Sequence, residues 1–117
     1  IKKKNHEYYQ YCWGDDHRAK LPEHRNSNFW FYPLILDSIT DNNLSEIINK
    51  LGKKGVQVRP IWKPMRSLEH LKNCASTNLD VSEDLAQRTL CLPCSTSLVE
   101  KEIEIVVQTI KELITEK

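Results

Sequence analysis

The sequence has no apolar run of the length that a transmembrane helix needs, about 20 residues. Its N-terminus also lacks the apolar stretch of a signal peptide. Neither sign of charge is in clear excess, because 17 basic residues balance 16 acidic ones, whereas nucleic-acid-binding proteins usually show a clustered excess of Lys and Arg. These absences exclude the usual signals for a membrane or a nucleic acid as partner, and they predict a cytoplasmic protein.

Cysteine is also scarce, since four cysteines in a chain of this length do not indicate a secreted disulfide framework. Cys91 and Cys94 form a Cys-x-x-Cys motif, and His70 and Cys74 lie upstream at His-x-x-x-Cys spacing. Together these four side chains could supply a tetrahedral zinc site. However, Cys91 lies in an apolar run that indicates a buried strand, where cysteine acts as a small hydrophobe. We therefore expect no metal, and a small zinc-binding domain is the least favoured alternative.

The composition, 39% hydrophobic and 28% charged over 117 residues, predicts a single globular domain that spans residues 1–117 and has a modest core. Neither Gly nor Pro occurs before Gly14, so residues 1–13 are predicted to form a helix that ends there. The chain begins at Ile1 without a Met, in the middle of what should be a helix. We therefore expect a fragment of a longer polypeptide, with residues 1–13 as the end of a helix between two domains.

Runs of branched and aromatic residues predict the strands. The strongest run is 29–36, where Pro33 in the middle indicates an edge strand or a bulge. A short edge strand is expected at 18–21, and the run 90–92 indicates a buried strand. Residues 56–59 alternate between apolar and polar side chains, as in a half-buried strand.

Helices are predicted from apolar stripes and from capping boxes, in which a polar residue and a Glu three positions later satisfy free N–H groups of the first turn. The capping pairs are Asn43 with Glu46, Asp80 with Glu83, and Ser97 with Glu100, ahead of helices at 44–51, 81–88 and 98–114; a short helical segment is also expected at 67–72. The helix at 44–51 should end at Gly52 or Gly55. This order of elements predicts an α+β fold, with a small, mostly antiparallel sheet and helices packed mainly on one face.

The most informative segment is 55–66, where a short strand leads into a loop that contains two prolines. Proline fixes φ and lacks an N–H group, so we expect the strand ladder to stop at Pro60. The loop would then present Trp62, Lys63 and Arg66 together. An indole, an ammonium and a planar guanidinium on one loop could hold a phosphate or a flat ring. Trp62 could equally fill a core position.

Two motifs carry a resemblance to a known family. Residues 55–65 read Gly-Val-Gln-Val-Arg-Pro-Ile-Trp-Lys-Pro-Met, and residues 90–98 read Leu-Cys-Leu-Pro-Cys-Ser-Thr-Ser-Leu, ahead of a long amphipathic helix. In this order and at this spacing they resemble the C-terminal part of the DegT-type nucleotide-sugar aminotransferases, which are fold type I, pyridoxal phosphate enzymes. The resemblance covers about residues 28–114. It implies the fold of the C-terminal small domain of those enzymes.

The resemblance also implies a function for the complete enzyme. Pyridoxal phosphate would be held by a lysine of a larger domain, and an amino donor, usually glutamate, would supply the nitrogen for a 4-keto nucleotide sugar in bacterial surface glycan synthesis. The family further implies a homodimer. We expect no catalytic residue and no bound cofactor in this chain, which should be inactive alone. The family's substrate loop corresponds here to Arg59, Trp62, Lys63, Met65 and Arg66.

Several alternatives stay open. Arg59 could be the partner of a structural ion pair, and Arg66 stands where many relatives have His, which leaves no imidazole for that position. Asn28, Phe29 and Trp30 match an aromatic strand entry of the family and are expected to pack. A stand-alone binding or interaction module is the second hypothesis for the whole chain.

Overall fold

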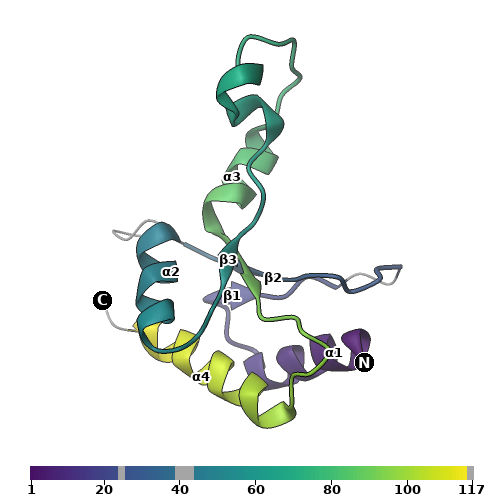
Figure 1. Cartoon of the computed structure of the whole chain (residues 1–117), viewed down its shortest axis with the longest axis vertical. Coiled ribbons are helices and arrows are strands. Elements are labelled where there is room, and N and C mark those ends of the chain that lie inside the picture. The colour runs from purple at the N-terminus through teal and green to yellow at the C-terminus, as the bar shows by residue number, and fades with distance from the viewer. Residues whose placement is uncertain (24–25, 39–43, 116–117) are drawn as a thin grey trace.

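The computed structural model describes residues 1–23, 26–38 and 44–115, which form one small sheet with helices around it (Figure 1). The elements are α1 (Lys2–Trp13), β1 (Ala19–Lys20), β2 (Tyr32–Leu36), α2 (Leu44–Lys53), β3 (Arg59–Pro60), the 3-10 turns η1 (Met65–Ser67) and η2 (Glu69–Leu71), α3 (Asp80–Arg88), β4 (Thr89–Leu92) and α4 (Glu100–Thr115). The strands pair in the order β1-β2-β4-β3, and every pair is antiparallel. The predicted α+β class is therefore confirmed.

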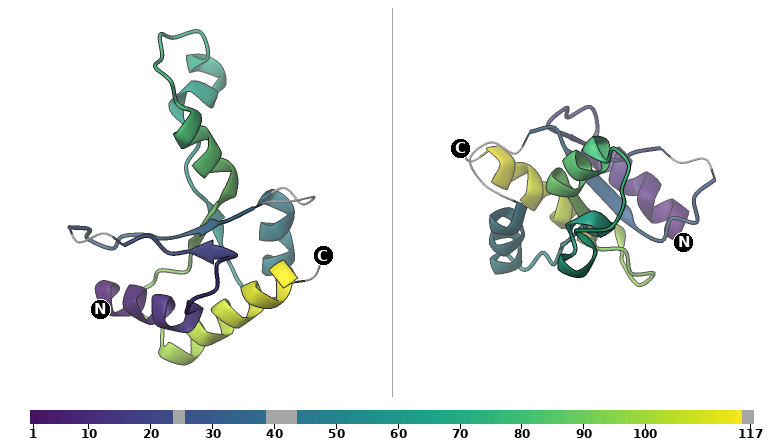
Figure 2. Two further views of the ribbon diagram at one scale, coloured as in Figure 1. Left: turned by 180° about the vertical axis from the view of Figure 1, so that it is seen from behind. Right: turned by 90° about the horizontal axis from the view of Figure 1, so that it is seen from above.

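The core lies on one face of the sheet. Tyr32, Leu34 and Leu36 of β2 are buried, and Leu92 and Leu90 lie opposite Tyr32 and Leu34 on β4. Figure 2 shows α1 and α4 together beneath this face. Full burial of such side chains contributes about 1.5–3 kcal/mol each to folding. The predicted packing of helices mainly on one face is thus confirmed, and the apolar stripe of α4 supplies much of the packing, through Ile103, Val106, Val107, Ile110 and Leu113.

The C-terminal end of α1 is fixed to both β1 and α4. The helix ends at Gly14, whose φ of 67° suits glycine and whose N–H donates to the Gln10 carbonyl at 3.0 Å. The indole N–H of Trp13 donates to the carbonyls of Asp16 and Ala19, at 2.8 Å in both cases. Lys111 of α4 donates to the Trp13 carbonyl at 2.8 Å. The predicted helix at 1–13 is confirmed, and these bonds set where β1 begins.

β2, the strand that contains Pro33, lies in the interior of the sheet, so the prediction of an edge strand was wrong. The N–H of Asp37 donates to the Arg18 carbonyl at 2.8 Å. The N–H groups of successive residues point to alternate sides of a strand. Pro33 and Asp37 are separated by an even number of positions, so the nitrogen of Pro33 faces β1, as that of Asp37 does. The pairs with β1 involve only Ile35 and Leu36. Pro33 is tolerated because β1 ends before reaching it.

The paired residues of β3 end at Pro60, as predicted, and one further backbone hydrogen bond to β4 follows. Pro60 lies opposite Leu90, and the N–H of Ile61 donates to the Thr89 carbonyl at 3.3 Å. The nitrogen of Pro60 therefore faces the outer edge of the sheet, where no donor is required. The paired strand begins later than expected: Val58 is buried, but pairing with β4 starts only at Arg59.

The capping residues of α3 and α4 differ from the predicted ones. Asp80 is the first residue of α3, and the Asn78 side chain accepts its N–H at 2.9 Å. Ahead of α4, the N–H of Val99 donates to the Glu102 carboxylate at 3.0 Å, so the cap is not at Ser97. At the start of each helix a neighbouring polar side chain thus accepts one backbone N–H, and neither predicted cap residue is the acceptor.

The predicted cap of α2 at Asn43 lies outside the described residues. At the other end, α2 runs through Gly52, and the helix is closed by Gly55, which has φ 83°. The N–H of Gly55 donates to the Gly52 carbonyl at 3.0 Å, and the N–H of Val56 to the Leu51 carbonyl at 2.9 Å. Of the two predicted stops, Gly55 is the one used.

Residues 61–88, between β3 and β4, form an extension that we call the arm; it projects from the rest of the molecule (Figure 1). The expected helical segment at 67–72 is present as the two 3-10 turns. The structure describes the whole arm, and no residue of η1, η2 or α3 in it is buried. Arg88 anchors its base by donating to the Leu36 carbonyl at 2.7 Å. Within the described ranges no helix is long and apolar enough to span a membrane.

Candidate functional site

The predicted substrate-binding residues lie where the arm leaves the sheet, but they do not all converge. Arg59 is on β3, Trp62 and Lys63 follow in the loop, and Met65 and Arg66 are in η1. All are exposed. Arg66 turns toward α3, where its Nε lies 3.8 Å from a carboxylate oxygen of Glu83. Trp62 instead contacts Phe31, and Phe31 and Arg59 line the same cavity.

Three aromatic rings meet at this point, and we call Trp30, Phe31 and Trp62 the aromatic cluster. The ring centroids of Trp30 and Phe31 are 4.7 Å apart, and those of Phe31 and Trp62 are 4.8 Å apart in an edge-to-face arrangement at 89°. Such contacts stabilise aromatic pairs. Nevertheless Trp62 is 69% exposed and Trp30 62% exposed. Trp62 therefore does not fill a core position. Trp30 was expected to pack, but most of its side chain is exposed.

Beside the aromatic cluster is a cavity of about 520 Å³, which we call the Arg59 groove. Its lining is mainly apolar and includes Phe31, Val56, Arg59, Cys91, Leu98 and Glu102. Within the described part of the chain, Arg59 has no ion-pair partner, and the Glu102 carboxylate already accepts the Val99 N–H. The alternative of a structural ion pair for Arg59 thus finds no support. Its guanidinium can bind an anionic ligand.

The loop that carries Trp30 has an unusual backbone. Phe29 adopts φ 54°, which is uncommon for a residue other than glycine. The Ser27 hydroxyl accepts the Phe29 N–H at 2.9 Å, and the Asn28 side chain accepts the Trp30 N–H at 3.1 Å. Lys2 donates to the Trp30 carbonyl at 3.2 Å. The sequence contains a signal for this turn that was not predicted, since Ser and Asn side chains commonly bond to the backbone two residues on.

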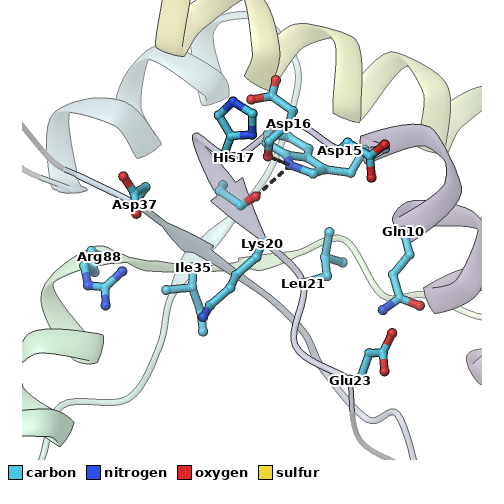
Figure 3. A pocket seen from close by; sticks show the side chains of 13 residues that line it. Gln10, Asp15, Asp16, His17, Lys20, Leu21, Glu23, Ile35, Asp37 and Arg88 are labelled. Atoms are coloured by element: carbon cyan, nitrogen blue, oxygen red, sulfur yellow. Dashed lines mark hydrogen bonds between the residues drawn. The ribbon is translucent and has the colours of Figure 1, made fainter.

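A second cavity, of about 570 Å³, lies around β1 and was not predicted (Figure 3). Several charged side chains line it, among them Asp15, Asp16, Lys20 and Arg88. Hydrogen bonds from Arg18 hold the pKa of Asp16 at about 2. In Figure 3 the labelled charged groups are spread around the hollow and do not point toward one centre. This arrangement therefore gives no indication of a particular ligand.

The proposed zinc ligands are not brought together. Within the residues that the structure describes, no three His, Cys, Asp or Glu side chains are placed to hold a metal ion. His70 and Cys74 belong to the arm, whereas Cys91 lies in β4 at the sheet. Burial raises the pKa of the Cys91 thiol, which disfavours the thiolate that zinc needs. The zinc-binding alternative is not supported.

The lysines of the chain do not fit a Schiff-base role toward pyridoxal phosphate. A reactive lysine is usually desolvated in a pocket, but none of the lysines in the described ranges is buried. The partly covered Lys2 and Lys111 donate to backbone carbonyls instead. The lysines in the described ranges therefore give no indication of a Schiff-base site.

Comparisons with known proteins agree with the two motifs. A model of the DegT/DnrJ/EryC1/StrS aminotransferase family matches residues 1–111. EpsN of Bacillus subtilis (strain 168), whose name describes a pyridoxal phosphate-dependent aminotransferase, is 30% identical over 93 residues. That match covers 74% of this chain and 23% of EpsN, so the chain spans less than a quarter of this relative's length.

Solved structures share the fold. The crystal structure of DesI with its TDP-sugar product has a TM-score of 0.86 at 22% identity, covering 98% of this chain and 31% of DesI. The Escherichia coli GDP-4-keto-6-deoxy-D-mannose-3-dehydratase with bound hydrated pyridoxal phosphate has a TM-score of 0.77 at 19% identity, covering 94% of this chain and 30% of that protein. With the family model matching nearly its whole length, this chain belongs to the DegT/DnrJ/EryC1/StrS aminotransferase family.

Proposed function

We propose that this chain is the C-terminal small domain of a longer, pyridoxal phosphate-dependent enzyme that aminates a 4-keto nucleotide sugar. The observation that carries the proposal is the family match over residues 1–111, combined with coverage of only 23% of EpsN and 31% of DesI. The rest of such a protein would hold the cofactor and its lysine. In this view residues 1–13 are the end of the helix that joins the two domains.

The chain contributes binding and orientation rather than a reacting group. Arg59, at the mouth of the groove, binds the phosphate oxygens of the nucleotide sugar through charge-assisted hydrogen bonds. Trp62, Lys63 and Met65 follow Arg59 along the chain and are exposed, so we assign them to the same substrate-binding surface. Arg66 adds positive charge while its ion pair with Glu83 keeps it near α3. Holding the substrate in one orientation can supply a large part of a rate enhancement.

The partners in this proposal are those that the family resemblance implies. Glutamate is the amino donor, the complete protein is a homodimer, and the glycan product is one of the bacterial surface polysaccharides. A cytoplasmic location remains a prediction from the sequence.

A second candidate reaction is dehydration of a nucleotide sugar. It is favoured by one specific observation, the likeness to the Escherichia coli dehydratase at a TM-score of 0.77. That enzyme shares the fold of the small domain and binds pyridoxal phosphate, according to the description of its structure. The fold of this chain is thus compatible with either reaction, and the assay has to separate them.

The test is an assay of the complete protein with pyridoxal phosphate, glutamate and a panel of 4-keto nucleotide sugars. Mass spectrometry of the products distinguishes an amine from a dehydrated sugar. We expect the amine, formed only when glutamate is present. Formation of a dehydrated sugar in place of the amine would support the second candidate, and no conversion of any nucleotide sugar would contradict both.

The 117-residue chain provides a companion experiment. Mixed with pyridoxal phosphate alone, it should develop no absorbance of an internal aldimine, because its described lysines lie outside any buried pocket. A stable adduct at one specific lysine after borohydride reduction would place the reactive amine in this chain and would contradict the division of roles.

A further inference from the structure

Resting on the proposed function, the geometry points to a further binding element: the aromatic cluster stacks against the flat base of the nucleotide, and Trp30 is a substrate-binding residue alongside Trp62. The sequence predicted only packing for Trp30. In this arrangement the base of the nucleotide lies on the aromatic rings, and its phosphates lie at Arg59.

The positions of the rings support this division. Phe31 contacts both tryptophans and also lines the Arg59 groove, so the aromatic surface and the cationic groove are continuous. The two tryptophan rings are 6.3 Å apart and tilted by 58°, and they remain largely exposed. Their outer faces are therefore available to a flat, unsaturated ring. A nucleotide, with a base at one end and phosphates at the other, matches this pairing of surfaces.

Trp30 is held in place before any ligand binds. Phe29 adopts its left-handed φ of 54°. The Ser27 side chain accepts the N–H of Phe29, and the Asn28 side chain accepts the N–H of Trp30. Lys2 donates to the carbonyl of Trp30 and also to that of Cys94, a lining residue of the groove. Backbone strain of this kind persists where the surroundings enforce it and is common at binding sites. A backbone that is already ordered at this position has less entropy to lose on binding.

Charge and size favour a small anionic ligand. Arg59 and Glu102 are the charged lining residues of the groove. Glu102 keeps its negative charge but accepts the Val99 N–H, and the Arg59 guanidinium is the charged lining group that can donate to an anion. Lys63 adds a second exposed cation next to Trp62. The volume of about 520 Å³ is in the range of pockets for small molecules.

A protein partner is the competing occupant, because exposed tryptophan and arginine are also frequent at protein interfaces. Such interfaces usually have an apolar, fully buried centre inside a polar rim. Here the aromatic rings instead border a concave groove with an unpaired cation, an arrangement suited to a ligand with a flat end and a charged end. The choice between the two occupants is made by the following experiment.

The experiment is isothermal titration of the complete protein with uridine, guanosine and thymidine diphosphates, and with inorganic pyrophosphate as a ligand that has no base. Trp30→Ala and Trp62→Ala should each weaken binding of the preferred nucleoside diphosphate by roughly 5- to 150-fold, the range for loss of one base–aromatic contact. Pyrophosphate binding should be unchanged. Trp30→Phe should recover most of the affinity, whereas Arg59→Gln should weaken both kinds of ligand.

Tyr11→Ala is the matched control, because Tyr11 is 79% exposed but lies on α1, outside the cluster. It should bind every ligand as the wild type does. Equal nucleotide affinity in the wild type and in Trp30→Ala would overturn the inference, as would loss of the homodimer in Trp30→Ala without loss of affinity, which indicates a protein interface. If the wild-type protein binds pyrophosphate but no nucleoside diphosphate, or binds neither, the proposed function fails as well, and the two failures are thus distinguished.

Discussion

Leucine shows how the arm differs from the body of the molecule, by which we mean the sheet with α1, α2 and α4. Leu34, Leu51 and Leu90 of the body are 0% exposed, whereas Leu71 and Leu79 of the arm are only half-buried. The body therefore buries its apolar groups within itself. The arm does not, and it is tied to the body by polar contacts such as that from Arg88 to the Leu36 carbonyl.

The difference explains where the candidate site lies. The body can hold a rigid surface, and the start of β2 and the end of β3 carry the aromatic cluster and Arg59. Side chains at these strand ends need not serve the core, so they are free to contact a ligand. Binding residues are often found on loops that a rigid scaffold positions.

The largest expected effect is a loss of stability in the body. Leu34→Ala should lower the free energy of unfolding by about 2–5 kcal/mol, because it leaves a cavity among fully buried neighbours. The matched change in the arm, Leu71→Ala, should cost about 1 kcal/mol or less, since that side chain is partly in water already. Denaturant unfolding followed by tryptophan fluorescence measures both. Equal losses would show that the arm is as tightly packed as the body.

The next effect concerns the junction of the two regions. Arg59→Gln in the complete enzyme should raise the KM for the nucleotide sugar roughly 10- to 150-fold, the value of a charge-assisted hydrogen bond, without lowering Tm. Arg66→Gln should raise KM less, below about 5-fold, because its guanidinium is shared with Glu83 in an exposed ion pair. Steady-state kinetics and thermal melts test the pair. Unchanged kinetics in both variants would return these arginines to a structural role.

A smaller effect compares two tryptophans. Trp13→Phe should cost about 1–2 kcal/mol, because the carbonyls of Asp16 and Ala19 lose their donor. Trp62→Phe should change the unfolding free energy by less than about 0.5 kcal/mol, as Trp62 is 69% exposed. Chemical denaturation of both variants gives the comparison. A larger loss for Trp62→Phe would mean that the aromatic cluster stabilises the fold.

Sequence patterns predicted which helices and strands form the body. They predicted strand pairing and helix caps less well. The run of aromatic and branched residues in β2 and the apolar stripe of α4 were sufficient, because such runs favour strands and burial imposes the helical period directly. The pattern at Pro33 could not show that β1 ends short of it, since that depends on a strand from elsewhere in the chain. The caps of α3 and α4 were displaced because several neighbouring polar side chains compete for the same N–H groups.

The candidate site was likewise predicted only in part from the sequence. Arg59 and Trp62 were identified from the motif at 55–65, but the freedom of Arg59 from ion pairs depends on long-range contacts that no local pattern reveals. Trp30 was expected to pack because aromatic residues in a strand-like run usually do. Its exposure follows from the φ of 54° at Phe29, which turns the chain just before β2 begins.

The smallest effect is a pH dependence within the body. Hydrogen bonds from Arg18 hold the pKa of Asp16 at about 2, below the ordinary 3.8. Because the folded pKa is the lower one, the pair contributes stability that is present above about pH 4 and is lost as the pH falls toward 2. Its surface position limits the contribution to about 1 kcal/mol or less. Arg18 also donates to the Thr115 hydroxyl, so the pair helps to hold the start of β1 against α4.

Thermal melts between pH 2 and pH 7 test this in the wild type and in Asp16→Asn. The variant should have a lower Tm at neutral pH and a shallower decline below about pH 4, since it has no carboxylate to protonate. Asp37→Asn is the control: this exposed carboxylate lines the same cavity but has no side-chain partner among the described residues. If Asp16→Asn and the wild type lose Tm in parallel on acidification, the Arg18–Asp16 pair does not secure β1, and the link between β1 and α4 then rests on Trp13 and Lys111.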